Sequence, residues 1–293
     1  MDQIFSAASF ILLYGVSYGV VLFTISVGLI VTMGLMRVVN LAHTAFAAIG
    51  GYISVTLMTA AGLAFPLAVL VAVLSVVVLS LVVEQIVYVH LYKASELDQV
   101  LMTIGLLFFS VAVLNLVFGP NAIAAHLPEM LSNSVHIMGR DVQIYRLFVI
   151  AAGIVLVLLL WFLLDRTNFG AKLRAAVDNR GMAQATGINV NLMFSLAFAL
   201  GSGLAAFGGA IGYAILPLEP MYPFKYLTLV LIVVTIAGTT NIKSSVATAT
   251  LVGIIDTAGR YLYPASAAFF IYFILLAITV WRNKGLLPGL AHR

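Results

Sequence analysis

Long stretches without any charged side chain constrain this chain more than any other feature of its sequence. The longest covers residues 38–83, and the others cover 3–36, 99–128, 147–164, 181–218 and 261–281. One helix needs about 20 apolar residues to cross the hydrocarbon core of a membrane. Only 8% of the residues are charged and 63% are hydrophobic, whereas soluble domains average about 25% and roughly 45–50%. We therefore expect an integral membrane protein.

These runs predict helices rather than the strands of a transmembrane barrel. Barrel strands alternate apolar and polar residues over about ten positions, whereas the runs here are apolar on every side. The predicted fold class is all-α, a polytopic transmembrane helical bundle with about eight or nine membrane segments in a single domain, residues 1–293. The expected spans are about 4–33, 41–60, 67–83, 101–118, 147–164, 192–216 and 261–281. Between the last two, 226–242 and 244–255 form either two thin spans or a re-entrant hairpin.

Three polar segments separate these spans. The first, 84–98, begins at Glu84 and is predicted to be a polar connection, and the others are 119–146 and 165–191. One side of the alternating spans collects ten Lys and Arg residues, and the other side has only four, which are Arg140, Arg146, Lys225 and Arg260. Because basic residues concentrate in cytoplasmic loops, we expect 165–191 and the C-terminus in the cytoplasm. The loop 119–146 and the N-terminus are then expected on the outer side.

No catalytic or nucleotide-binding pattern occurs in the sequence. None of the five histidines belongs to an H-E-x-x-H pattern, and the absence of cysteine excludes disulfides and thiolate metal sites. The segment 238–244 ends like a phosphate-binding loop, but Ile242 stands where such a loop needs glycine before its lysine. We therefore predict no enzymatic activity and no cofactor in this chain, so any energy from ATP must come from a partner. The net charge of +4 fits membrane topology, and no nucleic-acid partner is expected.

Two groups of polar residues interrupt apolar segments and are candidates for a translocation path. Arg37, Asn40 and His43 fall within seven residues between two spans, and Asp256 and Arg260 are four residues apart on one predicted helix. Polar groups buried in hydrocarbon must find partners or line a cavity. Structural roles are also compatible with the pattern: an arginine that reaches the membrane surface, a buried histidine, and, favoured for Asp256 and Arg260, an ion pair between positions i and i+4.

A stripe of small residues, Gly201, Ala205 and Gly209, repeats every four positions in the span 192–216. Small residues at this spacing let another helix backbone approach closely. We expect helix packing at this stripe, either within the chain or against a partner subunit.

The loop 165–191 combines basic residues with two short runs of good helix formers, 171–177 and 182–186. Asn179 and Gly181 separate the runs, and Gly187 ends the second one. Two short cytoplasmic helices would suit docking to a soluble subunit, whereas a solvated basic loop is the alternative interpretation.

Two blocks of this sequence resemble the permease subunits of branched-chain amino acid ABC importers. The first is MGLMRVVNLAH at 33–43, followed by Phe46 and Gly50. The second runs from RAAVDN at 174–179 through Ala183 and TGINV at 186–190 to AFALGS at 197–202. Together with the order of the spans, the resemblance covers nearly the whole chain. Thr44 departs from the family pattern, which usually has glycine after the histidine.

The resemblance implies a heteromeric importer in the bacterial inner membrane. In the family, the second block seats in a groove of the ATPase, so Arg174, Asn179, Ala183 and Gly187 are the expected ATPase-coupling residues. The implied partners are a second, related permease, two ATPase subunits that bind ATP and magnesium, and a periplasmic substrate-binding protein. The periplasmic loops 119–146 and 217–225 would receive that binding protein. Closure of the ATPases would tilt the permease helices and expose the path to alternate sides.

Branched-chain or related amino acids are the expected substrates, because similar permeases carry them. Relatives of the same type transport urea, short amides, other amino acids or aromatic acids. Two other classes stay open. A stand-alone channel or secondary transporter would work without ATP and use Asp256, Arg260 or Glu84 in ion coupling. An integral membrane enzyme would need clustered catalytic groups, and the histidines and acids here are scattered.

Overall fold

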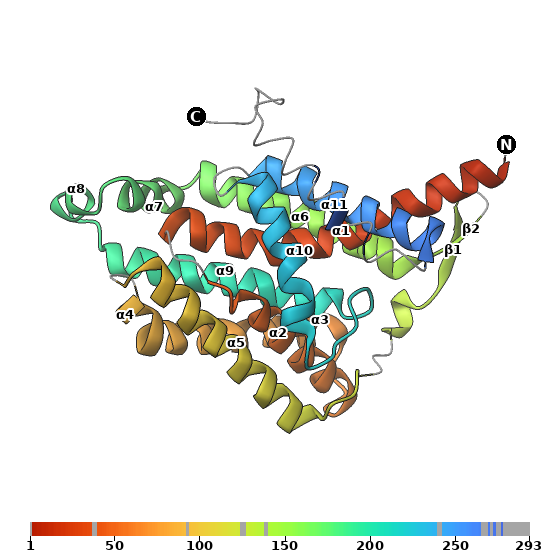
Figure 1. Cartoon of the computed structure of the whole chain (residues 1–293), viewed down its shortest axis with the longest axis horizontal. Coiled ribbons are helices and arrows are strands. Elements are labelled where there is room, and N and C mark those ends of the chain that lie inside the picture. The colour runs from red at the N-terminus through yellow and green to blue at the C-terminus, as the bar shows by residue number, and fades with distance from the viewer. Residues whose placement is uncertain are drawn as a thin grey trace.

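The computed structural model describes residues 2–36, 40–91, 94–123, 127–137, 140–238 and 242–264, together with 269, 272, 273 and 277. Arg37 and most of the expected final span 261–281 therefore lie outside the described residues. Within these limits the chain is a bundle of helices (Figure 1), which confirms the predicted fold class. The corner formed by α7 and α8 lies at one end of the long axis, and the N-terminus and the two strands lie at the other.

The helices follow the predicted spans closely. They are α1 (Asp2–Met36), α2 (His43–Thr59), α3 (Phe65–Val83), α4 (Val89–Leu91), α5 (Glu96–Phe118), α6 (Ile144–Asp165), α7 (Asn168–Asp178), α8 (Arg180–Ala185), α9 (Val190–Gly212), α10 (Tyr222–Ala237) and α11 (Ile242–Leu262). A turn of π-helix, Glu84–Tyr88, joins α3 to α4, and a short 3-10 turn covers Glu129–Leu131. The sequence did not predict the two antiparallel strands β1 (Ser134–Ile137) and β2 (Arg140–Gln143) in the loop before α6.

Five of these segments are long and apolar enough to cross a membrane. They are Ala7–Gly34, Phe65–Leu91, Glu96–Phe118, Ile144–Asp165 and Val190–Gly212. The helices α2 and α10 are apolar but shorter, with 17 and 16 residues. Helix α11 has 21 residues and carries Lys243, Asp256 and Arg260. The uncertain region 226–255 thus consists of one short apolar helix and one longer, more polar helix.

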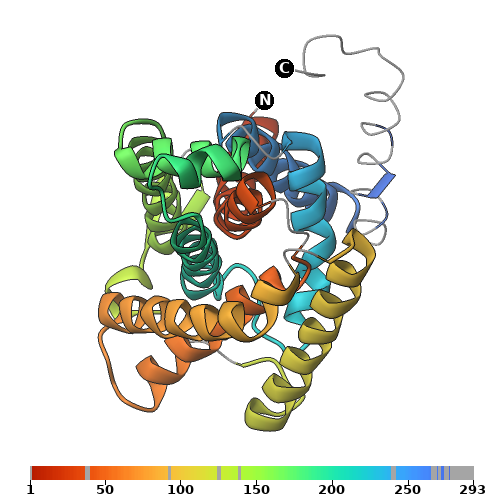
Figure 2. The same cartoon turned by 90° about the vertical axis from the view of Figure 1, so that its left-hand side faces the viewer.

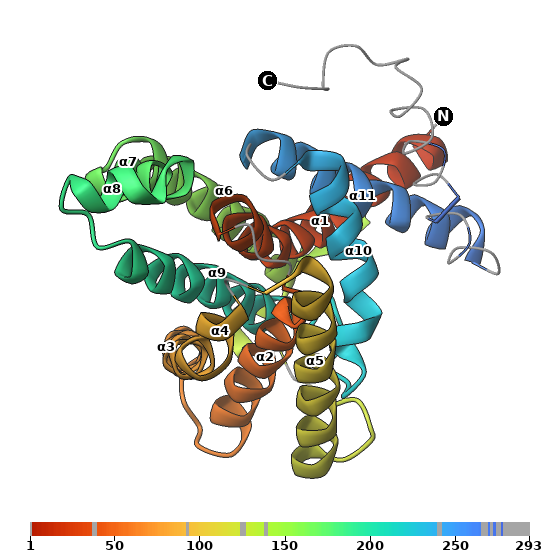
Figure 3. The ribbon, with the colours of Figure 1, turned by 60° about the vertical axis from the view of Figure 1, so that its left-hand side comes forward.

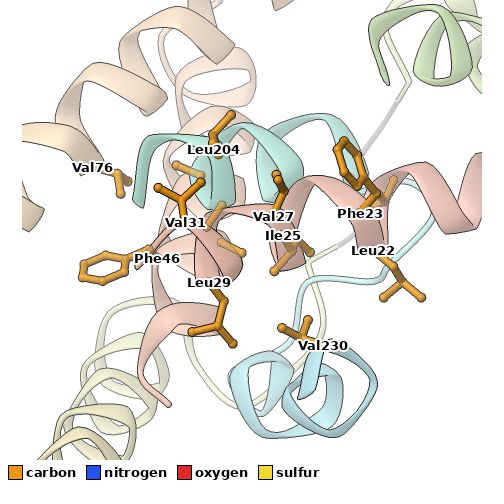
Figure 4. Close-up of a cluster of buried hydrophobic side chains, with 14 of the residues drawn as sticks. Leu22, Phe23, Ile25, Val27, Leu29, Val31, Phe46, Val76, Leu204 and Val230 are labelled. Atoms are coloured by element: carbon orange, nitrogen blue, oxygen red, sulfur yellow. The ribbon is translucent and has the colours of Figure 1, made fainter. Parts of the chain in front are cut away.

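Helix α1 is the centre of the bundle. Figure 2 looks nearly along it and shows α6, α9, α10 and α11 around it, and it packs against each of them. In its apolar span 83% of the residues are buried, against 17% in the spans of α5 and α6. Its side chains therefore project into the core in several directions, toward Phe46 of α2, Leu204 of α9 and Val230 of α10 (Figure 4). Helices α2, α3 and α5 lie together below α1 and α9 in the view of Figure 3.

Glycines let the helices around α1 approach it closely. A Cβ atom at Gly28 would overlap the backbone of Gly201 on α9, and one at Gly253 of α11 would overlap the backbone of Gly15 and Gly19 on α1. Helix interiors disfavour glycine by roughly 1 kcal/mol relative to alanine. At these positions close contact between helix backbones offsets the lower helix propensity of glycine, as it does for small residues in membrane helices.

Glu84 is the clearest local departure from the prediction. The sequence placed it in a polar connection, but the helix continues through it to Leu91 and the side chain is 1% exposed. Its carboxylate accepts hydrogen bonds of 2.9 Å from Ser195 Oγ on α9 and from Gln85 Nε2. A buried carboxylate is stable only when it is hydrogen-bonded. The partner on α9 is more than a hundred positions away in the sequence, so the local pattern could not reveal it.

Candidate functional site

The corner made by α7 and α8 is built by capping at both ends of α8. The Asn179 side chain accepts a hydrogen bond of 3.0 Å from the Met182 backbone N–H, which caps the start of the helix. At the other end, the Ile188 N–H donates to the Ala183 carbonyl and the Gly187 N–H donates to that of Gln184, both at 3.0 Å. This is the Schellman arrangement, and Gly187 has the left-handed φ of 84° that it requires. The two short helices expected in this loop are therefore present, with a fixed bend between them and a fixed end.

The structure gives the four expected coupling residues different positions in this corner. Asn179 and Gly187 are exposed caps, whereas Ala183 is 3% exposed and packs inward. Arg174 is half exposed, with a hydrogen bond to the Leu164 carbonyl and an Nη1–Oδ1 distance of 3.8 Å to Asp165. Three of the four thus shape the corner, and Arg174 ties it to the end of α6.

Met182 is an exposed apolar residue of the corner that the sequence analysis missed. Its side chain is 63% exposed on α8, among exposed polar and small residues. A lone methionine at the tip of a polar helix is a usable signal for a contact with another protein, because methionine adapts to irregular apolar surfaces. The base of the corner also touches the core: a cavity of about 270 Å³ lies between α7, the end of α6 and α1.

Asn40 and His43 lie inside the protein where α1, α2 and α9 meet. Both side chains are fully buried. Asn40 Oδ1 accepts a hydrogen bond of 2.6 Å from the Tyr88 hydroxyl, and the His43 ring lies against Gly28 of α1. Thr44, which stands where the family usually has glycine, donates its hydroxyl hydrogen to the Pro223 carbonyl at 2.9 Å. These contacts hold the start of α2 against α1 and α10.

The stripe Gly201, Ala205 and Gly209 packs within this chain. Gly201 faces Gly28 of α1, Gly209 faces the backbone of Ala47 on α2, and Ala205 is fully buried. One stripe therefore joins α9 to two different helices.

Asp256 and Arg260 face a cleft at the opposite end of the molecule from α7 and α8. The Asp256 carboxylate accepts a hydrogen bond of 2.7 Å from Arg260 Nε and is 4% exposed, whereas the Arg260 side chain is 65% exposed. We call this space of about 460 Å³ the outer cleft, after the side of the membrane that the distribution of basic residues predicts for it. It is lined by Phe10, Tyr14, Tyr18, Arg146, Ile215, Pro217, Lys225, Tyr226, Asp256, Thr257, Arg260 and Tyr261.

The candidate path residues therefore form two groups rather than one site. His43 touches α1 at Gly28, whereas Tyr18 of α1 lines the outer cleft with Asp256. At 1.5 Å per residue these two levels are about 15 Å apart along the helix. Arg37 lies outside the described residues. The aromatic residues of the cleft and Arg146 were not among the predicted site residues, because they come from segments that are distant in the sequence.

Comparison with known proteins places the chain in a family. The family described as "Branched-chain amino acid transport system / permease component" matches residues 11–279. No curated protein matches at a significant level. A similar solved structure is a chain of "PsaBC from Streptococcus pneumoniae in complex with Fab", with a TM-score of 0.48 and 13% identity over 91% of this chain and 87% of that one. The family match covers most of the sequence, so this multi-pass membrane protein belongs to the branched-chain amino acid transport permease family.

Proposed function

We propose that this chain is the permease subunit of an ABC importer that carries branched-chain or related amino acids across the bacterial inner membrane. Its N-terminus is periplasmic and its C-terminus is cytoplasmic. It works with a second, related permease, with two ATPase subunits that bind ATP and magnesium, and with a periplasmic binding protein that delivers the substrate. Family membership supports the transport role, and the distribution of basic residues supports the orientation.

The α7–α8 corner is the observation that carries the ATPase assignment. It lies at one end of the bundle (Figure 1), is capped at both ends of α8, and presents the exposed Met182. The chain continues from the corner directly into α9, which packs along α1. A displacement of the corner by closing ATPases would therefore pass to the central helix through rigid elements. The opposite end, with β1, β2 and the outer cleft, is left for the binding protein.

Met182→Asp is expected to remove the ATPase subunits from the purified complex. A carboxylate pressed into an apolar groove loses its hydration, and loss of a central contact residue typically costs about 2 kcal/mol or more, roughly thirtyfold in affinity. The measurement is the amount of ATPase that co-purifies with the tagged chain in mild detergent. Met182→Leu is expected to retain it.

Met130→Asp is the matched control for this experiment. Met130 is another exposed methionine, in the loop before β1, so the substitution adds the same charge away from the corner. Equal ATPase recovery from Met182→Asp and Met130→Asp would refute the docking assignment.

Uptake by the reconstituted complex tests the transport proposal itself. Proteoliposomes containing all subunits and loaded binding protein are expected to accumulate leucine, isoleucine or valine only when ATP is present. Uptake of urea, short amides or aromatic acids in place of these amino acids would refute the proposed substrate class and assign another. Transport by this chain alone, without ATP, would instead favour a channel or a secondary transporter.

A further inference from the structure

The outer cleft contains an arginine that no carboxylate neutralises in the part of the chain that the structure describes. Arg146 Nη1 donates a hydrogen bond of 3.0 Å to Ser17 Oγ, and its Cζ lies 3.8 Å from the centre of the Tyr14 ring. Its Nε is buried and has no hydrogen-bond partner among the described residues. A guanidinium offers five N–H donors, so Arg146 keeps unused donors and an unpaired charge.

The acids near the cleft are already engaged by other cations. Asp256 is bound by Arg260, and Lys225 Nζ lies 2.5 Å from Glu219 Oε1. Three cations and one carboxylate line the cleft, and because Glu219 and Asp256 neutralise two of the cations, the excess positive charge is that of Arg146. Arg146 is only partly exposed and its Nε is buried, so its guanidinium is held in the wall of the cleft against Tyr14 and Ser17.

The four basic residues that the sequence assigns to the outer side all gather at this cleft. Arg146, Lys225 and Arg260 line it. Arg140 of β2 donates a hydrogen bond of 3.0 Å to the Tyr261 hydroxyl, and its Cζ lies 5.2 Å from the centre of the Phe10 ring. Membrane proteins keep basic residues scarce on the outer side, so their concentration at one concave site indicates attraction of an anionic group.

The walls and size of the cleft suit a small molecule with an apolar body. Tyr14, Tyr18, Tyr226, Phe10 and Tyr261 provide aromatic surface. The volume of about 460 Å³ falls in the usual range of roughly 300–1,000 Å³ for small-ligand sites. A surface that docks another protein would present projecting side chains. Here the unpaired arginine, Arg146, is instead set back in the wall of the cleft.

We propose that the outer cleft binds the carboxylate of a small, apolar amino-acid-type substrate, with Arg146 as the carboxylate-binding residue and the aromatic walls around the substrate side chain. This inference rests on the proposed importer function and names a stage of it. The substrate leaves the binding protein and pairs with Arg146 before it passes along α1. Arginine suits this role because its planar guanidinium matches a carboxylate with two parallel hydrogen bonds.

The absence of cysteine from the chain makes the cleft directly testable. Thr257 lines the cleft, and Ala61 is exposed in the turn between α2 and α3, away from both the cleft and the α7–α8 corner, so Thr257→Cys and Ala61→Cys each provide one thiol. The complete complex is placed in nanodiscs, and the rate of maleimide labelling of this chain is measured without ATP. L-Leucine and 4-methylpentanoate, which share the carboxylate, are expected to slow labelling at Thr257→Cys and leave Ala61→Cys unchanged. Leucinamide, which lacks the negative charge, is expected to protect neither thiol.

Adding Arg146→Gln to Thr257→Cys is expected to raise the concentration of leucine needed for half-protection by roughly tenfold to a hundredfold, because a hydrogen-bonded charged contact is lost. The comparison of leucine with leucinamide uses native Arg146, so it stands even if Arg146→Gln does not fold. Equal effects of leucine and leucinamide would overturn the inference. Protection by the binding protein without any small carboxylate would also overturn it, in favour of protein docking.

The ATP-dependent uptake assay separates the two proposals. Carboxylate protection of Thr257→Cys in a complex that shows no ATP-driven uptake would leave the cleft assignment standing and refute the importer. ATP-driven uptake by a complex in which leucine does not protect Thr257→Cys would leave the importer standing and refute the cleft assignment.

Discussion

Replacing Gly209 with leucine is expected to prevent the chain from accumulating as a folded membrane protein. Any side chain at Gly209 would overlap the backbone of Ala47 on α2, and backbone cannot move aside without displacing the whole helix. Overpacking a well-packed core typically costs about 1–3 kcal/mol and occasionally more, and here the obstacle is rigid, so we expect the upper end of that range. The measurement is the yield of monodisperse protein in mild detergent and its thermal stability.

Gly105→Leu is the control that separates this clash from the general effect of the substitution. Gly105 also lies within a helix, α5, but nothing lies within 4 Å of a Cβ atom built there. Leucine is a better helix former than glycine, so Gly105→Leu is expected to give wild-type yield. Normal yield and stability from Gly209→Leu would show that α2 and α9 are not packed as described.

Replacing Gly187 with valine is expected to abolish ATP-dependent uptake while the chain still inserts into the membrane. No atom lies within 4 Å of the added Cβ, so the substitution creates no clash, but φ is +84°. A left-handed conformation costs an ordinary L-residue about 1–2 kcal/mol, and a β-branched residue is least suited to it. Relief of that strain would undo the hydrogen bonds that end α8 and shift the corner. Uptake is measured in proteoliposomes, with insertion checked by yield from membranes.

Gly187→Asn is the matched substitution, because asparagine tolerates the left-handed conformation. It is expected to retain most of the uptake although its side chain is about as large as that of valine. If valine and asparagine at this position performed alike, the fixed end of α8 would have no part in coupling.

Local patterns in the sequence predicted the features that depend on neighbouring residues. The uncharged runs indicated the helices, and the helix formers around Asn179 and Gly187 indicated α7 and α8 with their boundaries nearly correct. Capping and turn preferences act within a few residues, so they can be seen in the chain itself. The ion pair between Asp256 and Arg260 is likewise a relation between positions i and i+4.

Features that depend on distant partners could not be found in this way. Glu84 remained in a helix because Ser195 of α9 binds its carboxylate. The candidate path residues divided into two groups because α2 and α11 meet α1 at different levels. In the sequence Arg146 indicated only the orientation of the spans, whereas the structure places it beside Tyr14 in the outer cleft. Contacts between residues that are distant in the chain produce no periodic pattern in a single sequence, so they could not be predicted from it.

The central position of α1 has a consequence for how the protein is made. Among the described helices α1 is made first, yet the two that pack most extensively against it, α9 and α11, are two of the last three. Ribosomes add about 5–20 residues per second, so α1 waits for roughly tens of seconds before these partners arrive. During that time the positions at Gly15, Gly19 and Gly28, against which α11 and α9 later pack, stay uncovered by these two helices. A chain whose synthesis stops before α11 lacks the helix that packs on Gly15 and Gly19 of α1.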